Sequence, residues 1–98
     1  MLRQRSQPYR SRKWLANVHE IDCCVLCGSY GVQAAHRNQG KGMSMKVDDC
    51  LTAAICPTCH HDIDNAPGMD REQRRARLDH AICLTLAELA RRGLVEAV

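Results

Sequence analysis

The chain contains no phenylalanine, and one tryptophan and two tyrosines are all the aromatic residues among its 98 positions. A chain of this length is expected to form one domain, but so few large apolar side chains leave little material for its hydrophobic core. We therefore expect an additional stabilising element that compensates for the small core. A structural zinc ion is such an element, because its ligation is coupled to folding and contributes on the order of 10 kcal/mol.

Long apolar segments are also missing. The sequence begins Met-Leu-Arg-Gln-Arg instead of an apolar signal segment, and no run approaches the roughly 20 apolar residues of a membrane span. The seven cysteines are an odd number, which speaks against a framework of disulfides. These absences favour a reduced, cytoplasmic protein without a membrane partner.

The net charge of +3 is small, but the basic residues are unevenly distributed. Five of them precede the first acidic residue, namely Arg3, Arg5, Arg10, Arg12 and Lys13. We expect residues 1–10 to form a flexible basic arm, because they have nothing apolar to bury. Such an arm either holds phosphates or is merely a solvated tail, and the sequence leaves both open.

Four cysteines form two pairs with the two-residue spacing of zinc knuckles. Of the adjacent Cys23 and Cys24, only Cys24 has this spacing to the next cysteine, and we choose it as the ligand. The predicted structural zinc ligands are Cys24, Cys27, Cys56 and Cys59. The three left over are expected to be small buried hydrophobic residues; they are Cys23, Cys50 and Cys83.

Apolar periodicity and capping residues predict an α+β domain over residues 11–98. A first helix begins after Ser11 and carries Trp14 in a packing role, strands cover 32–36 and 51–55, and a short helix covers 59–64. A final helix begins at Asp70, with a capping box to Gln73, and ends at Gly93. Its apolar stripe either folds back on the zinc module or pairs across a homodimer; the stripe comprises Leu78, Ile82, Leu86 and Leu89.

One histidine ends the first expected strand, and others lie in the helix after the second. His36 ends the first strand, and the loop after it, with Gly40-Lys41-Gly42, is rich in basic residues and contains no acid. That loop lacks the spacing of a Walker A motif, but it suits backbone and lysine contacts with a phosphate. In the short helix that follows the second strand, His60 and Asp64 share a face, with His61 three residues before Asp64.

The order of knuckle, strand ending in histidine, loop, strand, knuckle and short helix resembles the zinc-stapled HNH, or ββα-metal, nucleases. Ala34-Ala35-His36, the Gly-Lys-Gly-Met loop and the stretch Cys-Pro-Thr-Cys-His-His-Asp-Ile-Asp are similar to small phage and prophage nucleases of the YbcO and recombination-enhancement (Ref) kind. The resemblance implies a treble-clef-like ββα-metal module with flanking N- and C-terminal helices.

The resemblance also implies roles for individual residues in a metal-dependent DNA endonuclease. His36 would be the general base, and Asp49, more than Asp48, would stand where the family has its middle asparagine. His60, with Asp64 or His61, would hold one catalytic Mg²⁺ or Mn²⁺. The residues expected to bind DNA phosphates are Arg37, Lys41, Lys46, Arg10, Arg12 and Lys13.

One position departs from the family pattern. Many HNH enzymes have an acidic residue or a second histidine before the general base, where it binds the metal, whereas this chain has Ala35. The YbcO-like proteins share this form. A second interpretation therefore stays open, in which the chain is a non-catalytic zinc module that binds nucleic acid or a protein through its basic arm and helix. The two interpretations differ in whether they require His36.

Overall fold

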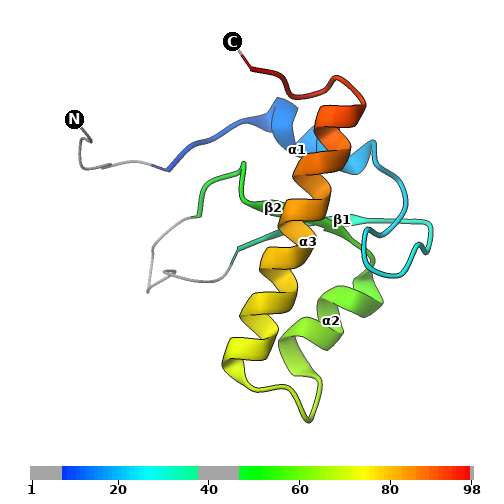
Figure 1. Cartoon of the computed structure of the whole chain (residues 1–98), viewed down its shortest axis with the longest axis vertical. Coiled ribbons are helices and arrows are strands. Elements are labelled where there is room, and N and C mark those ends of the chain that lie inside the picture. The colour runs from blue at the N-terminus through cyan, green and yellow to red at the C-terminus, as the bar shows by residue number, and fades with distance from the viewer. Residues whose placement is uncertain (1–7, 38–46, 98) are drawn as a thin grey trace.

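A computed structural model describes residues 8–37 and 47–97 of the chain. Within these ranges the elements are, in order, α1 (Arg12–His19), β1 (Gln33–His36), β2 (Thr52–Ile55), α2 (Pro57–Asn65) and α3 (Arg71–Arg91) (Figure 1). The α+β class predicted from the sequence is confirmed. None of the helices in the described ranges has the length and apolar content needed to cross a bilayer.

The two strands form an antiparallel hairpin. Its register pairs Gln33 with Ile55 and His36 with Thr52. Each strand is one residue shorter at its start than the sequence indicated. The strand centres are alanines, whose small side chains let helices approach the sheet closely.

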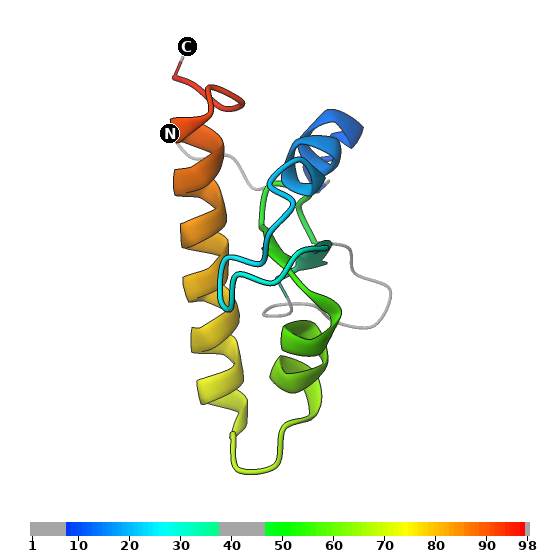
Figure 2. The ribbon, with the colours of Figure 1, turned by 90° about the vertical axis from the view of Figure 1, so that its right-hand side faces the viewer.

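The three helices surround this hairpin. In Figure 2, α3 runs along one side of the molecule, while α1 and α2 lie above and below the strands. The outer edge of β2 meets α3, where the backbone N–H of Ala54 donates to Thr85 Oγ1 at 2.9 Å. The backbone oxygen of Ala54 accepts from the N–H of Val25, so the first knuckle also lies against this edge.

Helix ends follow the predicted caps in α1 and α3. Ser11 caps α1, and Asp70 with Gln73 forms the capping box of α3. Gly93 has a positive φ of 72°, and the bond from Leu94 N–H to the Leu89 carbonyl closes the turn beyond α3. The helix predicted over 59–64 was placed too late, because Pro57 begins it and the Cys56 thiol caps it.

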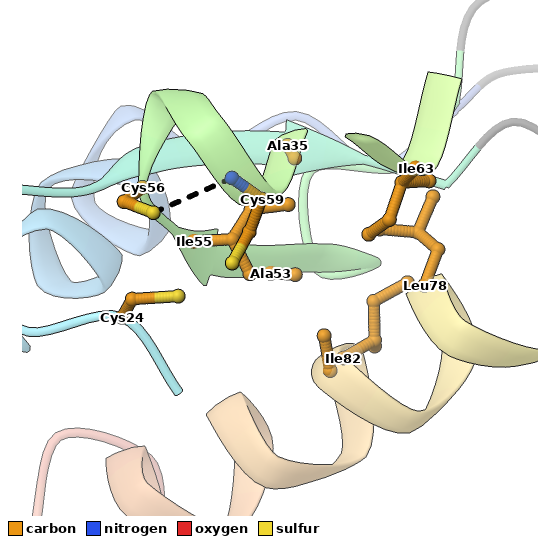
Figure 3. Close-up of a cluster of buried hydrophobic side chains, with 10 residues drawn as sticks. Cys24, Ala35, Ala53, Ile55, Cys56, Cys59, Ile63, Leu78 and Ile82 are labelled. Atoms are coloured by element: carbon orange, nitrogen blue, oxygen red, sulfur yellow. Dashed lines mark hydrogen bonds between the residues drawn. The ribbon is translucent and has the colours of Figure 1, made fainter. Parts of the chain in front are cut away.

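Two clusters of buried side chains both include residues of α3. The first joins Cys24, Cys56 and Cys59 to Ile55, Ile63 and Leu78 (Figure 3), and the second joins Val18 of α1 to Leu89. Leu78, Ile82 and Leu89 of the stripe therefore pack against their own chain.

The predicted apolar stripe is wrong at one position. Leu86 is 47% exposed, and the residue of α3 that contacts β2 is instead the buried Thr85. The side chain of Trp14, as predicted, packs against the second cluster, where it also makes an edge contact with Tyr9.

Candidate metal centre and active site

The ligand atoms of four cysteines lie within 4.8 Å of one another, and they belong to Cys24, Cys27, Cys56 and Cys59. The Cys27 and Cys56 sulfurs are 3.6 Å apart, close to the roughly 3.8 Å edge of a tetrahedron with zinc–sulfur bonds of about 2.3 Å. All four cysteines are free thiols. The cluster is thus compatible with a structural metal ion such as zinc, and the choice of Cys24 over Cys23 is confirmed.

Local backbone structure places these sulfurs. Gly28, with a φ of 83°, allows the turn after Cys27, and its N–H donates to the carbonyl of Cys24. On the other side, Cys56 lies between β2 and α2, and its sulfur accepts from the N–H of Cys59. A strand end and a helix start therefore hold the second pair, while a tight turn holds the first.

The electrostatics of the cluster favour a bound cation. Hydrogen bonds with Ser29, followed by contacts with the Cys56 and Cys24 thiols, lower the pKa of Cys27 to about 6. Burial, followed by the neighbouring thiols, raises the pKa of Cys59 well above its ordinary range. Four thiols this close resist becoming thiolates together unless a positive ion neutralises them, which a divalent metal does.

The three cysteines outside the cluster do not behave as expected. We predicted buried hydrophobic roles, but Cys23 and Cys83 are exposed and Cys50 is only partly covered. Cys23 lies in an isolated bridge with Tyr30 at the base of the knuckle turn, where its side chain points away from the core.

His36, the predicted general base, contacts Asp49. Its Nε2 lies 2.9 Å from Asp49 Oδ1. The aspartate side chain is almost completely buried, whereas 33% of the histidine side chain is exposed. A buried carboxylate thus fixes the orientation of an imidazole that stays open to solvent.

Asp49 is held from the other side by the segment before α1. Its Oδ2 accepts the backbone N–H of Ser11 at 2.8 Å, and its Oδ1 also accepts from Arg10 at 2.9 Å. Burial alone would raise the pKa of Asp49, but the hydrogen bonds from His36, Ser11 and Arg10 together lower it below its ordinary value. Asp49 is therefore ionised at neutral pH, and it acts only as an acceptor.

This segment was expected to belong to a flexible arm. Instead, the N–H of Tyr9 donates to Asp48 Oδ1 at 2.6 Å, and the Tyr9 carbonyl accepts the N–H of Asp49 at 2.8 Å. Residues 8–10 are thus attached to the domain, and the rest of the arm, residues 1–7, lies outside the described residues. We call Tyr9, Arg10 and Ser11 the N-terminal strap.

The residues predicted to hold a catalytic ion are only partly brought together. His60 Nε2 lies 3.8 Å from Asp64 Oδ2 on α2, while His60 Nδ1 lies 2.8 Å from Gln33 Oε1. His61 is far more exposed and lies near Asp62 instead. Within residues 8–37 and 47–97, the four cysteines are the one group of three or more candidate metal ligands.

His36 and His60 approach opposite faces of the hairpin. Ala35 packs with Cys59 and the α2 side of the core, whereas Ala34 packs on the α1 side. Side chains alternate along a strand, so His36 shares the α1 side with Ala34. Ala35 is 1% exposed, so the position before the base is filled by the core.

The basic residues predicted to bind phosphates have different surroundings. The Arg37 guanidinium pairs with Asp79 of α3 at 2.8 Å, which raises the pKa of Arg37. Arg12 and Lys13 are exposed on the first turn of α1. Lys41 and Lys46 lie outside the described residues.

Sequence analysis did not single out Gln33 or the strap as parts of the site. The sequence did contain a signal for Gln33. It lies two residues before Ala35 in the expected strand, and because side chains alternate along a strand, both residues lie on the same face. No local signal connected Tyr9 to Asp48, which is 39 positions away. A scan against protein-family models found no match, and searches of curated proteins and of solved structures found none either.

Proposed function

We propose that the protein is a metal-dependent DNA endonuclease that hydrolyses phosphodiester bonds with His36 as general base. The observation that supports this most is the 2.9 Å contact between His36 Nε2 and the buried carboxylate of Asp49. A carboxylate in this position selects one tautomer of the ring and stabilises its protonated form. In this proposal Asp49 positions the base and does not itself touch the substrate.

The tautomer follows from the charge of Asp49. Because the lowered pKa keeps Asp49 ionised, its oxygens accept and His36 Nε2 donates. The lone pair of the neutral ring is then on Nδ1, which would accept a proton from the water that attacks phosphorus. Asp49 would lower the free energy of the imidazolium formed in that step.

The developing charge on the leaving 3′ oxygen requires compensation as well. A divalent ion such as Mg²⁺ or Mn²⁺ supplies it when bound. His60 and Asp64 are the described residues that we propose for holding this ion, with Gln33 orienting the ring of His60. Because His60 approaches the opposite face of the hairpin from His36, this part of the proposal requires the DNA backbone to reach both faces. The four-cysteine cluster, in contrast, would hold zinc as the structural core of a treble-clef-like ββα-metal fold.

The setting that we propose follows the resemblance to small phage and prophage nucleases. The partner is DNA, contacted mainly along its backbone, and the reaction belongs to recombination or DNA processing in the cytoplasm of a bacterial host. Exposed Arg12 and Lys13 beside the strap would add phosphate contacts on the same side of the hairpin as His36.

A plasmid-nicking assay with Mg²⁺ or Mn²⁺ tests the proposal. Zinc-loaded wild-type protein should nick supercoiled plasmid, and His36→Ala should lose at least about a hundredfold in rate, the typical contribution of a general base. His80→Ala is the matched control, because His80 is exposed on α3 and has no part in the proposed site. Equal nicking by His36→Ala and His80→Ala would refute the role of His36.

A second candidate function is a non-catalytic zinc module that binds nucleic acid. It is favoured by the placement of His36 and His60 on opposite faces of the hairpin, with Ala35 buried between them. On this alternative, DNA affinity should fall steeply with salt while no divalent ion produces nicked plasmid. A salt-insensitive interaction would indicate a protein partner.

A further inference from the structure

Two cationic or potentially cationic side chains meet on a single oxygen. Asp49 Oδ1 lies 2.9 Å from His36 Nε2 and 2.9 Å from Arg10 NH1. Two donors on one acceptor at these distances lie roughly 4–5 Å from each other. Arg10 therefore lies immediately beside the imidazole, although 26 positions separate the two residues in the sequence.

Both side chains keep polar atoms available beyond this contact. The Arg10 side chain is 49% exposed and that of His36 is 33% exposed. Among the described contacts, Arg10 uses one of its five N–H donors, because only NH1 is bonded to Asp49. The remaining donors form a planar fork that suits the oxygens of a phosphate group.

The charge of Asp49 does not prevent an anion from approaching. Its side chain is only 6% exposed, and both of its oxygens are already bonded to donors. Arg10 balances its negative charge, and the strap fixes the backbone of Arg10 through the two bonds of Tyr9. The arginine is thus held in place before a ligand arrives, which lowers the entropic cost of binding.

We infer that Arg10 forms a binding site for one phosphate group, in which it holds the phosphodiester of DNA next to the imidazole of His36. The assignment of the group to a DNA phosphodiester rests on the proposed function, whereas the anion site itself does not. The N-terminal strap thereby becomes part of the substrate site.

The test is an NMR titration of zinc-loaded, ¹⁵N-labelled protein without added divalent ion. Two probes are compared: a thymidine dinucleotide with one internal phosphodiester and thymidine monophosphate with one terminal phosphate. The dinucleotide should shift the Arg10 Nε–H and His36 ring signals saturably. Arg10→Ala should weaken this binding about tenfold, the usual worth of a charge-assisted pair. Arg75→Ala is the matched control and should leave this binding unchanged, because Arg75 is exposed on α3 and has no part in the proposed site.

Arg10→Lys controls for the case in which Arg10→Ala fails to fold. It keeps the positive charge but lacks the planar guanidinium, so its affinity for the dinucleotide should lie between those of wild type and Arg10→Ala. Equal weakening by Arg10→Ala and Arg75→Ala, or the absence of a saturable shift, would overturn the site. Shifts with the monophosphate alone would overturn the assignment to a phosphodiester.

The titration separates this inference from the proposed hydrolysis. If the dinucleotide binds through Arg10 but plasmid is never nicked, the anion site is upheld and the nuclease is refuted. If wild type nicks plasmid while Arg10→Ala and Arg75→Ala bind and cleave alike, the nuclease is upheld and the site is refuted.

Discussion

Replacing Asp49 by asparagine tests whether this buried carboxylate organises the histidine site. The substitution keeps the shape and one acceptor oxygen, which still serves the N–H of Ser11, but it removes the charge. Arg10 is half exposed, so its ion pair contributes little after screening by solvent. The main losses are the charge-assisted bond to His36 and the charge assistance of the bond from Ser11, which together make Asp49→Asn less stable by about 2 kcal/mol.

The size of this effect depends on pH in a defined direction. The pKa of Asp49 is lowered in the folded state, so its stabilisation is present above the unfolded value near 3.8 and is lost as pH falls through the folded value. The stability difference between wild type and Asp49→Asn should therefore be present at about pH 5 and above and should shrink below about pH 4, where the carboxylate is protonated. Comparing the two proteins cancels the effect of zinc release, which acid promotes in both.

Urea unfolding followed by circular dichroism measures this difference, with zinc content determined at each pH. A loss of about 2 kcal/mol corresponds to roughly 8–16 °C in Tm for a domain of this size, so thermal unfolding gives a second readout. Equal stability of the two proteins at pH 7, or a difference that does not shrink below about pH 4, would refute this account of Asp49.

Other perturbations test the core and the metal centre. Chelation should unfold the protein, and one equivalent of zinc per chain should restore its circular dichroism spectrum; a folded, metal-free protein would contradict the structural role of the cysteines. Leu89→Ala should cost about 2–5 kcal/mol in urea unfolding because the residue is buried, whereas Leu86→Ala on the exposed face of α3 should cost under about 0.5 kcal/mol. Thr85→Val should cost about 1–3 kcal/mol by depriving the buried N–H of Ala54 of its acceptor, and a neutral result would show that this bond is dispensable.

Local signals in the sequence predicted much of the fold. Ser11, Asp70 and Gly93 mark helix ends through their own backbone preferences, and the structure places caps at all three. The paired cysteine spacings likewise predicted the four-thiol cluster, because a two-residue gap itself brings two sulfurs onto one ion.

Features that depend on distant packing were not predictable. Leu86 has the same spacing from Ile82 as other members of the stripe, and only the position of β2 decides that Thr85 faces inward instead. Arg74 donates to the carbonyls of Asp64 and Ala66 at the end of α2, contacts that no local pattern indicated. Such contacts depend on how α2 and α3 meet.

The same limit applies to the candidate site. His36 contacts Asp49, and both residues flank the loop between the strands, so their sequence positions made this contact foreseeable. The strap was missed, because its bonds to Asp48 and Asp49 join segments that no local pattern connects. The orientation of His60 toward Gln33 likewise depends on the angle at which α2 crosses the hairpin.

The most direct test of the central claim is chemical rescue of His36→Gly in the plasmid-nicking assay. Removing the ring leaves the buried carboxylate of Asp49 beside an open space, into which added imidazole can diffuse. The account predicts that zinc-loaded His36→Gly is inactive with Mg²⁺ or Mn²⁺ and that imidazole restores nicking in a concentration-dependent manner, whereas Asp49→Asn is not rescued. Full nicking by His36→Gly without imidazole would contradict it.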